Sequence, residues 1–178
     1  MIEPDDKDWT WVLERPCSEC GFDASTFAAD QVAAEARANA TTWVRLLASP
    51  GASNRFRDDR WSVLEYACHV RDVFRVCDYR LDRMLTEDGP HYENWDQDVT
   101  AADERYAEQD PATVAGEVVA AAEIIARRFE TVTGESWART GFRSDGAAFT
   151  IDSFARYVIH DPMHHVWDVS GNLTTRQM

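Results

Sequence analysis

Apolar residues recur at spacings of three and four along much of this chain, and the pattern is clearest between residues 62 and 88. That period predicts an amphipathic α-helix of about six turns with one buried face. Ser62 and Glu65 form a capping box at its start, and the turn signal at 88–90 ends it. The apolar stripe consists of Val63, Ala67, Val70, Phe74, Cys77, Leu81 and Met84.

The sequence predicts three further long helices. One runs over about 25–48, with Asp23 or Ser25 as its cap and a Ser-Pro-Gly stop after it. Another runs over 110–132, where an aspartate N-cap is followed by proline at the first helical position. The last begins near residue 150 or 152 and ends at Gly171, a residue favoured just beyond a helix end.

The remaining segments are less regular. Residues 1–24 are predicted to be an irregular N-terminal segment, and one short helix is expected near 101–107. Between 137 and 149 a Ser-Asp-Gly turn signal predicts a small hairpin or an extended loop. The tail, 172–178, is expected to fray. The sequence therefore predicts an all-α four-helix bundle over 25–171, with no internal repeat.

Composition excludes several classes of protein. The chain has 178 residues, 44% of them hydrophobic, which suits one domain with a substantial core. Its net charge of −14, without a basic stripe, argues against binding to nucleic acid or anionic membrane. No apolar run approaches the roughly 18 residues of a membrane span, and the acidic start has no signal-peptide core. We therefore expect a cytoplasmic protein with four reduced cysteines.

Three of the five histidines are candidate metal ligands. His160 and His164 lie four residues apart, so on a helix both rings leave the same face. His69, about ninety residues earlier, would supply a third ligand from a neighbouring helix. Three protein ligands with an open position are typical of a catalytic metal site. The alternative is that each histidine is a hydrogen-bonded residue at the edge of the core.

Four residues around this set invite a structural or a functional interpretation. Pro162 is either a tolerated kink or a bend that sets the angle between the paired histidines and frees a carbonyl. His165 points about 100° away from His164 and is either a hydrogen-bond donor behind the ligands or, as we expect, a surface residue. Asp168 could accept a hydrogen bond from His164. Glu65 could orient His69 or act as a base, although the capping box already explains it.

The sequence allows several interpretations of the cysteines. Cys17 and Cys20 form a C-x-x-C pair followed by glycine, half of a zinc knuckle that needs two more ligands. Cys68 and Cys77 face opposite sides of one predicted helix and cannot complete it together. The pair is therefore read as incidental or locally structural, with a disulfide, a redox dithiol or a metal contact by a folded-back N-terminal segment as alternatives.

Two stretches of the chain contain the three candidate histidines: 61–72, WSVLEYACHVRD, and 157–168, YVIHDPMHHVWD. They resemble the second-helix and fourth-helix signatures of the DinB-like superfamily, and the resemblance covers about residues 25–170. It implies an up-down-down-up bundle with a divalent metal, often zinc or nickel, held by the matching His69, His160 and His164. Dimers are common among such bundles.

The resemblance also implies a function. Members of the superfamily include mycothiol-dependent maleylpyruvate isomerase and S-transferases that use bacillithiol or mycothiol. The implied mechanism is metal activation of a low-molecular-weight thiol, which then attacks a small-molecule electrophile. Two rivals stay open: a non-catalytic metal-binding or stress-response protein, and a C-x-x-C redox or metal-relay protein.

Overall fold

Four long helices make up most of the computed structural model, which describes residues 8–174. The acidic start at 1–6 and the end of the predicted tail lie outside the described residues. The helices are α1 (Val32–Leu47), α2 (Val63–Thr86), α4 (Pro111–Glu130) and α5 (Ile151–Thr174). The predicted helical class is confirmed.

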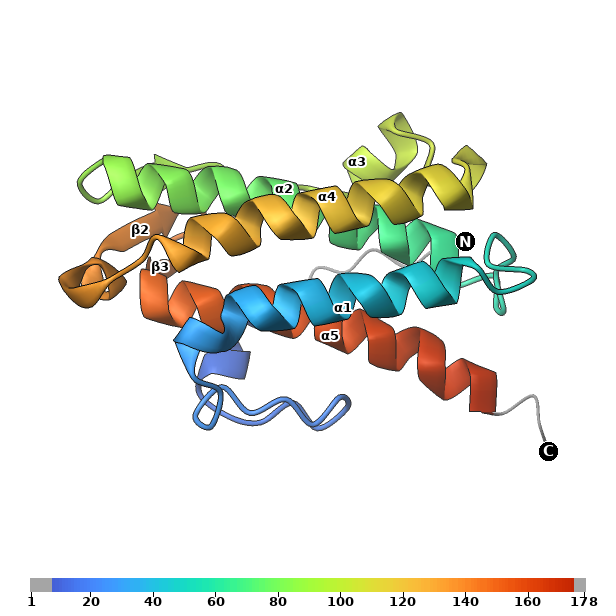
Figure 1. Cartoon of the computed structure of the whole chain (residues 1–178), viewed down its shortest axis with the longest axis horizontal. Coiled ribbons are helices and arrows are strands. Elements are labelled where there is room, and N and C mark those ends of the chain that lie inside the picture. The colour runs from blue at the N-terminus through green and yellow to red at the C-terminus, as the bar shows by residue number, and fades with distance from the viewer. Residues whose placement is uncertain (1–7, 175–178) are drawn as a thin grey trace.

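The four long helices form a bundle in which α1 and α2 lie on opposite corners. Each of them packs against both α4 and α5. Following the colour gradient, α1 and α5 run in one direction and α2 and α4 in the other (Figure 1). The short helical turns are η1 (Trp9–Leu13), η2 (Ala29–Gln31), η3 (Tyr106–Glu108) and η4 (Gly134–Ala138). Within the described residues, no helix is both long and apolar enough to cross a bilayer.

The capping signals of α2 and α4 are confirmed. The hydroxyl of Ser62 accepts a hydrogen bond from the Glu65 amide, and the Glu65 carboxylate accepts one from the Ser62 amide. Asp110 accepts from the Thr113 amide at 2.8 Å, next to Pro111 at the first helical position. These bonds satisfy donors that a helix start otherwise leaves without partners.

Two predicted boundaries of the long helices are wrong. α1 begins at Val32 rather than near Ser25, because Asp23 accepts from the amide and hydroxyl of Ser25 and stabilises a turn there. α5 continues to Thr174 instead of stopping at Gly171. Glycine costs only about 1 kcal/mol inside a helix, which does not by itself end one.

A small sheet corrects the all-α prediction. The expected hairpin is present as β2 (Thr140–Arg143) paired antiparallel with β3 (Ala148–Thr150). A strand that was not predicted, β1 (His91–Tyr92), pairs parallel with β2. A two-residue strand has no alternating pattern that could be recognised in the sequence. At Gly141 a Cβ atom would lie 2.7 Å from Met84 Cγ, so β2 packs against α2 at a distance that only glycine permits.

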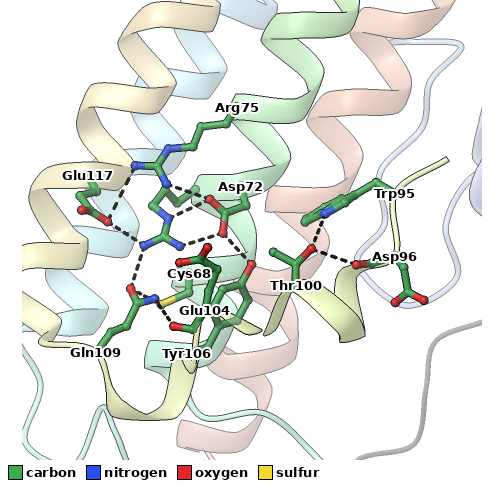
Figure 2. Close-up of polar contacts among 11 residues, drawn as sticks. Cys68, Asp72, Arg75, Trp95, Asp96, Thr100, Glu104, Tyr106, Gln109 and Glu117 are labelled. Carbon is green, nitrogen blue, oxygen red and sulfur yellow. Dashed lines mark hydrogen bonds and ion pairs between the residues drawn. The ribbon is translucent and has the colours of Figure 1, made fainter. Parts of the chain in front are cut away.

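The segment between α2 and α4 carries β1, the short helix α3 (Gln97–Asp103) and η3. The helix predicted at 101–107 begins earlier because Asp96 caps it, accepting from the Asp98 and Val99 amides. Thr100 accepts a hydrogen bond from the Trp95 indole at 2.7 Å and donates to the Asp96 carbonyl (Figure 2). Trp95 is therefore held at a defined position at the start of α3.

A buried polar network attaches this segment to α2 (Figure 2). Arg71 donates to both oxygens of Asp72 at 2.9 and 2.7 Å, and to Gln109 at 2.8 Å and Glu117 at 2.7 Å. The Tyr106 hydroxyl donates to Asp72 at 2.6 Å. Burial alone would raise the pKa of Asp72, but the bonds from Arg71 and Tyr106 hold it below its usual value.

We expect Tyr106→Phe to lower the free energy of unfolding by about 1.5–3 kcal/mol, because it removes a buried hydrogen bond to a charged acceptor. Since Asp72 has a lowered pKa, that loss should shrink as acid protonates the carboxylate of the folded protein. Urea unfolding at neutral and acidic pH measures both effects. Tyr79→Phe, at a residue 59% exposed on α2, is the control and should stay within about 0.5 kcal/mol. Equal losses in the two variants would contradict this role.

Candidate metal centre

Helices α2 and α5 bring most of the candidate ligands to one cavity of about 500 Å³. His69 comes from the buried face of α2, and two pairs of adjacent residues come from the middle of α5. The N-terminal segment closes one side of the cavity through Trp9, and the segment before α3 closes another through Trp95. The α5 residues that line it are His160, Asp161, His164 and His165.

The first ligand group consists of His69, Asp161 and His165, whose ligand atoms all lie within 4.8 Å of one another. Asp161 Oδ1 is 3.3 Å from His69 Nε2 and 3.6 Å from His165 Nε2. His69 is fully buried, and neither of its ring nitrogens has a hydrogen-bond partner among the described residues. Burying a polar atom without a hydrogen-bond partner costs free energy, so a cation bound to these nitrogens would stabilise the folded protein.

The second group consists of Cys17, Cys20, His160 and His164, again within 4.8 Å of one another. The two cysteines lie on a turn that precedes η2, in which the Gly21 amide donates to the Cys17 carbonyl at 2.9 Å. Cys17 Sγ is 3.6 Å from His164 Nδ1, although the two residues are 147 positions apart. The N-terminal segment therefore folds back onto α5, one of the alternatives that the sequence left open.

The structure thus divides the predicted ligand set. His160 and His164 do share one face, but they face the two cysteines, whereas His69 faces Asp161 and His165. Asp161 and His165 also lie four residues apart. Each follows one member of the first pair by one position along α5, so the second pair leaves the helix about 100° away from the first. Sequence reasoning used the first i, i+4 pair and missed the second, although the spacing of an aspartate and a histidine was visible.

Several neighbours differ from expectation. His165 is not a surface residue: its side chain is 15% exposed, and its ring lies 4.8 Å from that of Tyr66. Asp168 approaches His165 Nδ1 at 2.9 Å and is 3.8 Å from His164, so His165 is its main partner. α5 continues through Pro162, whose own carbonyl accepts from Asn39 on α1 at 2.9 Å.

Aromatic rings cover the histidines. Trp95 stacks on His69 with centroids 5.4 Å apart and planes 5° from parallel, and Trp61 lies 5.4 Å from the same ring. On the other side, the Trp9 ring lies 5.6 Å from His160 and 5.0 Å from His164. The tryptophans therefore limit access of water to both groups while leaving the cavity open between them.

The electrostatics favour the forms that bind metal. Burial, aided by the nearby His164, lowers the pKa of His160 to about 4, and burial also lowers the pKa of His164. Burial alone would raise the pKa of Asp161, but its contacts with the rings of His69 and His165 hold it well below its usual value. The neutral imidazoles of His160 and His164 and the ionised carboxylate of Asp161 are the protonation states required of metal ligands.

A family model for the DinB superfamily matches residues 5–169, and the match includes the N-terminal segment. The chain belongs to the DinB superfamily. The resemblance seen in the two helical signatures is therefore confirmed, and it extends over Cys17 and Cys20, which the signatures did not cover. No curated protein matches the chain.

One solved structure with the same architecture is YfiT from Bacillus subtilis, described as a probable metal-dependent hydrolase with an unusual four-helix bundle topology. The TM-score is 0.69 at 20% sequence identity, and the match covers 84% of this chain and 85% of YfiT. At this identity the likeness supports the fold of this DinB-superfamily member and does not transfer an activity.

One cysteine lines the cavity, the buried Cys77 on α2. Burial raises the pKa of Cys77 to about 12, and it raises that of Cys68, which contacts Gln109 on the far side of α2, to about 12 as well. A thiol with so high a pKa is a poor nucleophile at neutral pH. Cys77 is therefore part of the cavity wall and not an activated cysteine.

We expect Cys77 to resist iodoacetamide at pH 8 in the native protein, because only about one thiol in ten thousand would be ionised there. Peptide mass spectrometry before and after denaturation measures the modification. A Tyr79→Cys variant places a cysteine at an exposed position of the same helix and should react within minutes. Comparable rates at Cys77 and at this control position would show that the cavity does activate a thiol.

Proposed function

We propose that this DinB-superfamily protein is a metal-dependent enzyme whose divalent ion is held by His69, Asp161 and His165. The observation that carries the proposal is the fully buried His69, whose ring nitrogens have no hydrogen-bond partner among the described residues and whose Nε2 lies 3.3 Å from Asp161 Oδ1, beside His165. The same three residues line a cavity of about 500 Å³, within the usual size range of small-molecule sites.

The donor set suits a catalytic ion. Two imidazoles and a carboxylate accommodate zinc, nickel or ferrous iron, and three protein ligands leave positions open for a reactant. A divalent ion bound there lowers the pKa of a coordinated thiol or water, which supplies a nucleophile at neutral pH.

The chain's own residues orient and shield this centre. Asp168 fixes the ring of His165 through Nδ1, leaving Nε2 directed at Asp161, the arrangement in which a carboxylate supports a metal-binding histidine. Trp61 and Trp95 cover the ring of His69 and exclude water from it. The Asp161 side chain is 34% exposed, so the open side of the group is directed into the cavity.

The far end of the cavity offers a cation. His69, Val73, Val76 and Arg80 lie on one face of α2 and line the cavity together, spanning about 16 Å along the helix. Arg143, also in the wall, is neutralised by Asp145 at 2.8 Å. Arg80 instead donates to the Glu93 carbonyl and packs over the Tyr92 ring, and no carboxylate of residues 8–170 forms an ion pair with it. A reactant with an anionic group fits between this guanidinium and the metal ligands.

The reaction we propose is transfer of a low-molecular-weight thiol, such as mycothiol, to a small electrophile, or a thiol-dependent isomerisation. It is supported by membership of the superfamily, by the open metal-ligand group and by the absence of an activated thiol at Cys77. A second candidate is hydrolysis with water as the nucleophile, which the description of YfiT favours. The remaining alternative is metal binding without catalysis.

We expect His69→Ala to lose one equivalent of bound divalent metal and thiol-conjugation activity together. Elemental analysis measures the metal, and conjugation of mycothiol or cysteine to monobromobimane, with and without chelator, measures the activity. His91→Ala removes an exposed histidine outside both groups and should retain both properties. Full metal content in His69→Ala would contradict the site.

The assay also separates the candidate reactions. Ester or amide hydrolysis without thiol stimulation would replace the transferase proposal with the hydrolase one. A metal-loaded protein that accelerates neither reaction would favour the non-catalytic alternative.

We expect Arg80→Gln to raise KM for an anionic reactant about ten- to hundredfold, because it removes a charge-assisted hydrogen bond worth about 1.5–3 kcal/mol. The metal content should not change, since Arg80 lies three turns from His69. Steady-state kinetics with anionic and neutral thiols measure the difference. Arg127→Gln, at an exposed position of α4, is the matched charge control. An equal rise in KM for both kinds of thiol would show that Arg80 supports the fold rather than the anion.

A further inference from the structure

The four residues of the second ligand group have no role in the chemistry proposed above, yet they converge from two distant parts of the chain. Two cysteines on a turn meet two histidines one helical turn apart on α5. Three of the four are buried, and Cys20 is partly buried. A C-x-x-C turn with two histidines is a Cys2His2 donor set, the ligand composition of closed structural zinc sites.

We propose that Cys17, Cys20, His160 and His164 bind a structural zinc ion that is separate from the ion at His69. The distances fit such a site. Arms of about 2.3 Å to sulfur and 2.05 Å to nitrogen give a tetrahedral sulfur–nitrogen edge of about 3.6 Å, and Cys17 Sγ is 3.6 Å from His164 Nδ1. The four ligand atoms already lie within 4.8 Å of one another. Side-chain shifts of under about 1 Å would bring them to the spacing of a tetrahedral zinc site.

The ring nitrogens are arranged for this role. His164 directs Nδ1 at Cys17 and Nε2 at the Glu19 carboxylate, 3.3 Å away, so that Glu19 can fix the ring as a metal ligand. His160 is 3% exposed, and its Nε2 is fully buried without a hydrogen-bond partner among the described residues. A buried nitrogen without a partner on this ring is an independent sign that His160 lacks a ligand.

The charge balance also favours the site. Binding converts two thiols to thiolates and releases two protons, while both imidazoles stay neutral. Two thiolates neutralise a zinc ion, so the buried centre carries no net charge. Four protein ligands leave no position open for a substrate, which makes the site structural rather than catalytic.

Such a zinc ion would organise the catalytic side of α5. It would join the N-terminal segment to α5, holding Trp9 against His160 and His164 in the cavity wall. Asp161 directly follows His160 and His165 directly follows His164, so the same six-residue stretch of α5 carries ligands of both groups. Binding on one face of that stretch restrains the ligands on the adjacent face.

Cobalt substitution tests the proposal because only the second group contains sulfur. We expect the cobalt-loaded protein to show a thiolate-to-cobalt charge-transfer band in the near ultraviolet, retained in His69→Ala and lost in Cys17→Ser and Cys20→Ser. The zinc-loaded wild type should contain one zinc more than either cysteine variant, and X-ray absorption should show sulfur neighbours at about 2.3 Å. An unchanged zinc content in both cysteine variants would overturn the proposal.

A measurement on the wild-type protein guards against misfolded variants. Bound zinc should protect Cys17 and Cys20 from maleimide, and chelation should expose both to labelling. Labelling at equal rates with and without zinc would overturn the proposal. A second result would also overturn it: protein that is purified under reducing conditions, holds no zinc and has a mass two hydrogen atoms below that of the fully reduced chain. That mass would identify a Cys17–Cys20 disulfide and therefore a redox pair.

Discussion

Successive side chains of an α-helix leave its axis about 100° apart, and this constraint divides the ligand residues of α5 into two sets. His160 and His164 face the N-terminal segment, while Asp161 and His165 face α2. The helix must remain regular through Pro162 for both pairs to keep their directions, and the bond from Asn39 to the Pro162 carbonyl ties that turn to α1. The other residues that surround the centre pack against one of these two faces of α5.

Each face is completed by a segment outside the four long helices. Residues 8–24 bring two cysteines and Trp9 to one face. On the other, the segment between α2 and α4 brings Trp95 over His69, and the buried Arg71–Asp72–Tyr106 network attaches that segment to α2 (Figure 2). The bundle thus supplies rigid positions for the ligands, while irregular segments enclose them, as is common where function is placed on a scaffold.

The sequence predicted what depends on local patterns. The long helices, the Ser62–Glu65 capping box and the hairpin before α5 all follow from periodicity, caps and turn residues. The start of α1 was missed because the Asp23 turn competes with a helix over the next few residues. The grouping of the candidate ligands could not be predicted, because which face of α5 meets which segment depends on tertiary contacts, and the Cys17–His164 contact joins residues 147 positions apart.

Charge explains why two such different groups can lie side by side on one helix. A zinc ion with two thiolates is neutral, so it can be buried under Trp9 at little electrostatic cost and has no charge left to attract a reactant. A divalent ion beside the single carboxylate of Asp161 keeps one positive charge, and Arg80 adds another at the far end of the same cavity. The wall of the cavity also carries Asp8, Asp96, Asp98 and Asp145, the last of them paired with Arg143. Within the described part of the wall, unpaired positive charge is therefore confined to the ion and to Arg80, and the cavity favours an anionic reactant whose charged group reaches one of these two points.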